Sequence, residues 1–223
     1  MTANGAGPAI RVRGLTKDYG RGRGVFDVSL EVAAGEVLGF LGPNGAGKTV
    51  TMRHLMGFIK PQKGMVQILG HDCFRERPQV QASLGYLPGE GACMQEMTAR
   101  SFLDLMAGMR GMRDRSRMLE IADVFELDLG ARIGGMSKGN RQKVAIVAAF
   151  MARPDVLLLD EPLKGMDDGT VGRVMSYVAP LLEGRTVVWV THDPREAALL
   201  PDPVAWRVED GLVRPARGRL VRR

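Results

Sequence analysis

The stretch GPNGAGKT, residues 42–49, follows directly on the apolar run EVLGFL, residues 36–41. Its pattern, G-x-x-x-x-G-K-[S/T], is that of a phosphate-binding loop between a strand and a helix. The glycines leave backbone N–H groups bare, so these groups can surround phosphate oxygens, and the N-terminus of the following helix adds positive potential. The stretch therefore predicts a strand, a loop and a helix that together bind a nucleoside triphosphate.

Two side chains of this loop suit the chemistry of a phosphate chain. Lys48 can reach the β- and γ-phosphates of a bound nucleotide and so act in catalysis, and the hydroxyl of Thr49 can ligate Mg²⁺. We expect the whole loop to contact the nucleotide. Its expected contacts are Gly42, Pro43, Asn44, Gly45, Ala46, Gly47, Lys48, Thr49 and Val50.

Composition limits the class of protein. The chain has 223 residues, of which 45% are hydrophobic and 25% charged, as is typical of a globular domain with an ordinary core. The longest apolar stretch, residues 144–152, is about half of the ~20 residues needed to span a bilayer. We therefore expect any role at a membrane to require a partner. The net charge of +6 permits contact with nucleic acid or anionic lipid but does not require either.

Polar residues follow three apolar runs. The run at 36–41 leads into the phosphate loop, the run at 156–159 leads into Asp160 and Glu161, and the run at 186–190 leads into Thr191-His192-Asp193. In open parallel sheets, ligands bind beyond the carboxyl ends of the strands. If these strands are parallel, the three groups meet around one phosphate chain. Asp160 is then placed to hold Mg²⁺, Glu161 to polarise the attacking water, and His192 to donate to the γ-phosphate.

The order of the patterns predicts how the chain is organised. Residues 10–32 alternate around a glycine-rich break, which indicates antiparallel strands. Between about residues 90 and 150 helical periodicity dominates: Thr98 is expected to cap a helix that runs to Met109, a second helix is expected from about 116 to 125, and a third over 138–151. We expect one domain over 1–223: an α/β core at 10–88 and 150–213, a helical insertion at 89–149 and a basic tail at 214–223.

Seven segments stand in a recognisable order and spacing: LTKDYG (15–20), GPNGAGKT (42–49), GYLPGE (85–90), MSKGNRQKV (136–144), VLLLDEP (156–162), LKGMDD (163–168) and THD (191–193). Together they resemble the nucleotide-binding subunit of ATP-binding-cassette (ABC) transporters, over nearly the whole chain. The segment MSKGN stands where that family has its LSGGQ signature, and it discriminates better than the phosphate loop, which many ATPase and GTPase families share. The segments GYLPGE and SKGNRQKV also resemble those of bacterial exporters whose cassette and membrane subunits are separate chains.

The resemblance implies roles for four further residues. Tyr19 would stack on the adenine of ATP, while Ser137 and Gly139 would contact the γ-phosphate of ATP bound to an opposite subunit. Asp167 would couple the two sites across the interface. Ser137 and the N–H groups that open its helix also form an anion site on physical grounds.

The resemblance also implies the fold and the partners. The fold class would be α/β, a P-loop NTPase (RecA-like) core with an N-terminal antiparallel β subdomain and an inserted α-helical subdomain. ATP and Mg²⁺ would be bound, and ATP hydrolysed. The partners would be a second ABC ATPase subunit and integral membrane permease subunits, at the cytoplasmic face of the cell membrane. Nucleic acid is not an expected partner.

The chain departs from the family pattern at three positions. Gly89 stands where the family commonly has Gln, so that either Glu90 or water substitutes, or coupling is looser. Val50 replaces a second hydroxyl after the lysine, and Lys164 replaces a small polar residue. Two alternatives to an exporter ATPase therefore stay open: a cassette ATPase acting in cofactor assembly or on nucleic acid, and a regulatory subunit that binds ATP but hydrolyses little.

Overall fold

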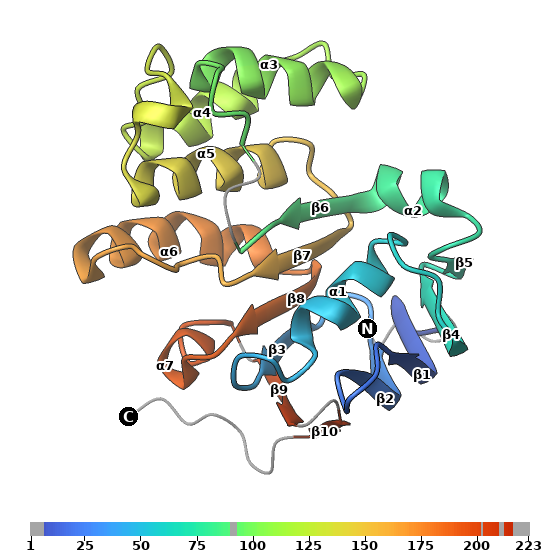
Figure 1. Cartoon of the computed structure of the whole chain (residues 1–223). Helices are drawn as coiled ribbons and strands as arrows, with labels where there is room; N and C mark the ends of the chain where they lie inside the picture. Colours follow the sequence, from blue (N-terminus) through green and yellow to red (C-terminus); the bar gives the residue numbers. More distant parts are fainter. Residues whose placement is uncertain (1–6, 90–92, 202, 210–211, 216–223) are drawn as a thin grey trace.

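The three apolar runs that precede polar residues form the centre of one parallel sheet (Figure 1). We describe the protein from a computed structural model that covers residues 7–89, 93–201, 203–209 and 212–215. The strands of this sheet are β3 (Val37–Leu41), β6 (Leu84–Leu87), β7 (Val156–Asp160), β8 (Thr186–Thr191), β9 (Val204–Glu209) and β10 (Leu212–Pro215). Their order is β10-β9-β3-β8-β7-β6, and all are parallel except β10, which is antiparallel to β9.

Side chains of the central strands alternate between two hydrophobic clusters, one on each face of the sheet. In β7, Leu157 and Leu159 belong to one cluster, and Val156 and Leu158 belong to the other. All four are 0% exposed. A continuous apolar run is what a parallel strand needs when both of its faces are covered. The polar residues that end these strands are therefore held by a fully packed platform.

One face of the parallel sheet is covered by α1 and by a second, antiparallel sheet with the order β2-β1-β4-β5, as the N-terminal residues predicted. Figure 1 shows both at the side of the molecule where the chain begins. The short helix α2 adds Val80 to the same cluster. The elements here are β1 (Ile10–Asp18), β2 (Gly24–Val32), α1 (Lys48–Leu55), β4 (Lys63–Ile68), β5 (His71–Asp72) and α2 (Arg77–Ser83).

The other face is covered by helices, and the predicted insertion lies outermost (Figure 1). Thr98 caps the first inserted helix by accepting a hydrogen bond from the backbone N–H of Ser101, as expected. None of the helices in the described part of the chain has the length and apolar character needed to cross a bilayer. The elements are α3 (Ala99–Met109), α4 (Ser116–Val124), a 3₁₀ turn η1 (Ile133–Gly135), α5 (Lys138–Phe150), α6 (Asp168–Leu182) and α7 (Pro194–Ala197).

A glycine allows α5 to pack closely against the sheet. A Cβ atom added at Gly85, in β6, would lie 2.6 Å from the carbonyl oxygen of Ala149 and 2.6 Å from Pro154 Cγ. No side chain fits in that space. Gly85 therefore allows close packing between the helix that begins at the MSKGN segment and the sheet that carries the predicted catalytic residues.

One expectation needs correction. The last strand takes in Arg214 and Pro215, which pair with Arg207 and Trp206, so the first two residues assigned to a basic tail belong to the sheet. The rest of that expected tail, 216–223, lies outside the described residues. In α5, residues 144–150 are buried in succession, because the helix lies between the sheet and the insertion.

Candidate active site

The phosphate loop connects β3 to α1 and has the backbone that its glycines predict. Gly45 and Gly47 have φ angles of 84° and 104°, a region that favours glycine. The helix α1 then begins at Lys48 without a side-chain cap and without an acidic residue in its first turn. Its first N–H groups are therefore available to an anion, and the helix dipole favours negative charge at this point.

Lys48 lies across its own loop. Its Nζ donates hydrogen bonds to the carbonyl oxygens of Gly42, at 2.5 Å, and Pro43, at 2.9 Å. Only 6% of the residue is exposed. Burial lowers the pKa of Lys48, and the charges of Glu161 and Asp160 oppose that shift. The ammonium group therefore lies close enough to both carboxylates to interact with them, at the edge where phosphates would bind.

Asp160 ends β7 and is 8% exposed. Burial raises its pKa and the neighbouring charge of Glu161 raises it further, whereas Lys48 lowers it. A divalent cation would relieve this crowding of negative charge, so the carboxylate fits a magnesium site together with the exposed hydroxyl of Thr49. The described residues contain no cluster of three His, Cys, Asp or Glu side chains suited to a metal. Mg²⁺ bound with a nucleotide takes most ligands from phosphate and water.

Glu161 has a strained backbone that its neighbours hold in place. Its φ angle is 47°, in the left-handed region that non-glycine residues rarely adopt. Its N–H donates to the carbonyl oxygen of Val190 in β8 at 2.8 Å, and the Gln142 side chain donates to the next carbonyl, that of Pro162, at 3.1 Å. Strain kept in this way by surrounding contacts is typical of functional positions.

The carboxylate of Glu161 contacts two cationic or hydrogen-bonding side chains. His192 Nδ1 lies 2.9 Å from Oε1, and because the carboxylate accepts, the hydrogen belongs to Nδ1. Lys164 Nζ lies 2.6 Å from Oε2. Burial raises the pKa of Glu161, but the bonds from Lys164 and His192 outweigh burial and leave it below the usual value. Glu161 is therefore an ionised carboxylate at neutral pH, as a general base must be.

The signature segment presents its polar groups to solvent. Ser137 is exposed and caps α5, since its Oγ accepts a hydrogen bond from the N–H of Asn140 at 3.2 Å. Gly139 follows in the first turn. Figure 1 shows the start of α5 and the loop between β3 and α1 at separate places along the same side of the molecule. The structure therefore does not bring Ser137 or Gly139 to the phosphate loop of the same chain.

Three other residues expected to contact ATP, Tyr19, Asp167 and Val50, make contacts within the chain that do not involve the phosphate loop's carboxylate partners. The ring of Tyr19 is 52% exposed, and Lys17 Nζ lies 5.5 Å from its centre. Asp167 caps α6 by accepting hydrogen bonds from the N–H and the hydroxyl of Thr170, at 3.0 and 2.7 Å. Val50 packs against the hydrophobic cluster beneath α1. These contacts explain the fold around each residue and leave its role toward ATP a prediction.

Sequence reasoning did not assign Gln142 or the contact of Lys164 with Glu161. A signal for Lys164 was available, because it follows Glu161 by three residues in a segment of turns. The structure also gives Gly89 a reason of its own: an added Cβ would lie 3.2 Å from the carbonyl oxygen and 3.4 Å from Cγ of Asp160. Glu90, considered as a substitute for the usual Gln, lies outside the described residues.

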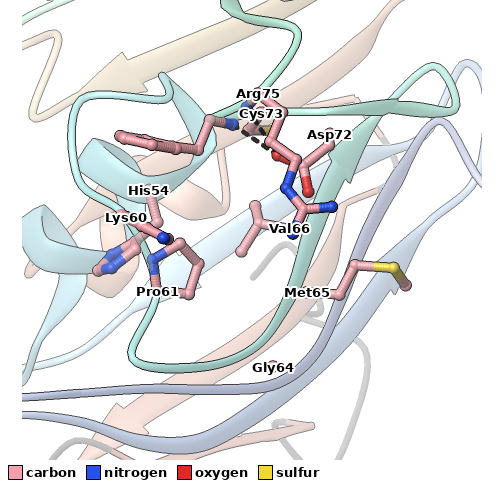
Figure 2. A pocket seen from close by; sticks show the side chains of 10 residues that line it. His54, Lys60, Pro61, Gly64, Met65, Val66, Asp72, Cys73 and Arg75 are labelled. Atoms are coloured by element: carbon pink, nitrogen blue, oxygen red, sulfur yellow. Dashed lines mark hydrogen bonds between the residues drawn. The ribbon is translucent and has the colours of Figure 1, made fainter.

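A pocket of about 140 Å³ opens elsewhere, between the end of α1 and strands β4 and β5 (Figure 2). None of the described residues that line it belongs to the predicted site. The predicted nucleotide site, at the carboxyl ends of the parallel strands, is therefore separate from this pocket. The lining residues are His54, Lys60, Pro61, Gly64, Met65, Val66, Asp72, Cys73, Phe74 and Arg75.

Comparison with known proteins places this geometry in a family. The ABC transporter family profile matches residues 25–164. A daunorubicin resistance ATP-binding protein of Streptomyces coeruleorubidus is 35% identical over 198 residues, covering 86% of this chain and 63% of that protein. The ABC transporter ATP-binding protein NatA of Bacillus subtilis is 33% identical over 189 residues, covering 82% of this chain and 77% of that protein.

Similar solved structures belong to the same family as the similar sequences. An ATP-binding subunit of an ABC transporter superposes with a TM-score of 0.85 at 27% identity, covering 95% of this chain and 90% of that one. A dimeric ATP-binding cassette in a post-hydrolysis state, bound to ADP and Pi, gives 0.81 at 25% identity, covering 94% and 99%. The P-loop fold expected from the sequence is confirmed. The chain belongs to the ABC transporter family, as one of its ATP-binding ATPase cassettes.

Proposed function

We propose that this chain hydrolyses ATP as the motor subunit of a membrane exporter, working as a pair of subunits that close around two ATP molecules. The observation that carries the proposal is the convergence of Lys48, Asp160, Glu161 and His192 at one sheet edge, while the signature loop of the same chain lies apart from it.

The geometry supports a direct attack of water on the γ-phosphate. The phosphate loop and Lys48 would hold the phosphate chain, and Thr49 and Asp160 would hold Mg²⁺, which would supply neutralisation of phosphate charge. Glu161 takes a proton from the attacking water as its oxygen bonds to the γ-phosphorus and the bond to the bridging oxygen of ADP breaks. His192 fixes one oxygen of Glu161 and can reach toward the γ-phosphate.

A second subunit would supply the remaining contacts. Ser137 and Gly139 open α5 with an exposed hydroxyl and N–H groups, which is an anion site without an anion partner in its own chain. In a head-to-tail pair, this loop of each subunit would contact the γ-phosphate bound by the other. The similarity to a cassette solved as a dimer with ADP and Pi supports this arrangement.

The proposed role in transport is supported by the names of related proteins. Relatives are named for daunorubicin resistance and for bacitracin transport, so a separate permease at the cytoplasmic face of the membrane is the expected partner of this chain. The chain spans 63% and 59% of those two relatives. Which compound is moved depends on membrane subunits, and nothing in the site of this chain recognises one.

The test of hydrolysis is Glu161→Gln, compared with Glu183→Gln at an exposed glutamate. Loss of the base should reduce ATP turnover by roughly 10²- to 10⁴-fold while the affinity for a fluorescent ATP analogue stays the same. The Glu183 variant should keep both. Unchanged turnover in Glu161→Gln would remove Glu161 as the base. A wild-type subunit that binds ATP without turnover, even when paired, would instead support the regulatory alternative.

A further inference from the structure

Lys164 contacts Glu161 through both its side chain and its backbone. Its Nζ lies 2.6 Å from Glu161 Oε2, and its N–H donates to the carbonyl oxygen of Glu161 at 3.1 Å. The side chain of Lys164 is 33% exposed and that of Glu161 is 10% exposed. The side chain of Lys164, three residues after Glu161 in the chain, therefore covers Oε2 of the carboxylate proposed as the base.

This contact makes Glu161 a poor base in the single subunit. The Oε2 atom has almost no surface accessible to water and makes no hydrogen bond of good geometry with the described residues, so its close contact is the ion pair with Lys164, and a water molecule cannot approach it while the arrangement lasts. The Oε1 atom accepts a hydrogen bond from His192.

The lysine is connected to the signature loop. A Cβ added at Gly165, the residue after Lys164, would lie 3.0 Å from Lys138 Cδ and 3.2 Å from its Cε. Lys138 is the first residue of α5 and stands between Ser137 and Gly139. The backbone of Gly165 therefore lies close to the side chain of Lys138, so a movement of Lys138 when the start of α5 engages a ligand would reach the segment that carries Lys164.

The backbone of Glu161 has a separate anchor. Gln142, also on α5, donates to the carbonyl oxygen of Pro162, and the Glu161 N–H donates to Val190. Neither bond involves Lys164. The carboxylate can thus exchange its partner while the residue itself stays in position.

We propose that Lys164 is a positioning residue that holds the Glu161 carboxylate idle in the single subunit and releases it when the signature loop engages the nucleotide of a second subunit. The inference rests on the proposed function, since it requires paired subunits and Glu161 as the base. It assigns to Lys164 a restraint on ATP turnover while the subunit is unpaired.

The first experiment compares Lys164→Met, which keeps the aliphatic stem, with Lys164→Arg, which keeps the charge. Lys60→Met, at an exposed lysine on the far side of α1, is the matched control. Breaking the contact is part of the cost of forming the active pair, so we expect Lys164→Met to raise the apparent kcat for ATP about two- to fivefold at low protein concentration, with KM unchanged, since a partly exposed ion pair contributes about this factor. Lys164→Arg and Lys60→Met should both stay near wild type.

Other outcomes overturn the inference. An unchanged kcat in Lys164→Met would show that the contact does not restrain the base. A lower kcat with a higher KM, restored by Lys164→Arg, would show that the lysine binds phosphate directly.

A second readout needs no ATP. In thermal unfolding of the nucleotide-free subunit, Lys164→Met should lower Tm more in the Glu161 background than in the Glu161→Gln background, because only a carboxylate pairs with the lysine. Equal shifts in both would contradict the pair. If Glu161→Gln hydrolyses ATP normally, the proposed function fails and the inference with it. If Glu161→Gln is inactive but Lys164→Met matches wild type, only the inference fails.

Discussion

The phosphate-loop edge and the signature loop are both proposed to contact phosphate but are built differently. At the first, Lys48, Asp160 and Glu161 are 6%, 8% and 7% exposed and contact one another or the loop backbone. At the second, Ser137 is exposed, and its hydroxyl and carbonyl oxygens accept hydrogen bonds from N–H groups of its own helix. One half of the site is formed within the chain, and the other half is left open at the surface.

The two loops differ in what holds their ligand-facing groups in position. Burial and strand pairing fix the phosphate-loop edge before any ligand arrives, so electrostatic stabilisation there needs little reorganisation. At the signature loop, only the start of α5 positions the groups that would bind an anion. Their attraction for an anion is weak while water surrounds them. A nucleotide held between two subunits would exclude that water.

The largest effect expected at the signature loop comes from Ser137→Asp. Aspartate still caps α5, so the fold should be kept, but its charge would repel a γ-phosphate. We expect ATP turnover to fall about tenfold or more while ATP binding to the single subunit stays unchanged. Turnover at rising protein concentration, together with binding of a fluorescent ATP analogue, measures both.

Ser176→Asp, at an exposed serine within α6, is the control and should behave as wild type. Equal loss of binding and turnover in Ser137→Asp would place the signature loop beside its own phosphate loop, contrary to the comparison.

A smaller effect is expected from Gly89→Ala, at the buried edge. The added methyl would press on Asp160 at 3.2 Å from its carbonyl oxygen, displacing a carboxylate meant for Mg²⁺. We expect turnover to fall about two- to fivefold, as a barrier increase of roughly 1 kcal/mol would give, with the Mg²⁺ concentration for half-maximal rate increased. A faster enzyme would contradict this prediction. It would show that Asp160 accommodates the methyl group without loss of activity and that Gly89 is not required at a position where the family commonly has Gln.

The smallest effect is expected from Asp167→Ala, which separates a cap from a role at the interface. Hydrogen bonds from the Thr170 hydroxyl and N–H lower the pKa of Asp167. Its folded-state pKa is below the unfolded value, so the stabilisation is present near neutral pH and is lost as pH falls through the folded pKa. Thermal unfolding at pH 7 should show Tm lower by roughly 2–4 °C, a difference that shrinks in acid.

Asp167→Asn keeps a capping side chain and should keep Tm. If it also keeps turnover, Asp167 is a cap alone. If turnover falls while Tm holds, the carboxylate acts between subunits.

The arrangement at the phosphate-loop edge could be predicted from the sequence better than that at the signature loop. Strand runs such as 156–159 follow from hydrophobicity, and parallel pairing then places Asp160 and Glu161 beside the phosphate loop, as observed. The Thr98 cap followed from local chemistry. What could not be read was packing between distant segments: Gln142 reaching Pro162, or Gly89 lying against Asp160. Such contacts depend on three-dimensional proximity that no local pattern encodes.

The role of Ser137 and Gly139 could be taken only from the resemblance, because half of their surroundings belongs to another molecule. The same holds for Tyr19, whose exposed ring has no neighbour in the chain that would mark an adenine site.

The central claim is that the open signature loop completes the site of a second subunit. The most direct measurement is the molar mass of Glu161→Gln in solution with and without ATP and Mg²⁺, by light scattering after size exclusion. The account predicts a monomer without nucleotide, a dimer with ATP, and a monomer in both conditions once Ser137→Asp is added. A dimer that forms equally with and without ATP, or that survives Ser137→Asp, would contradict it.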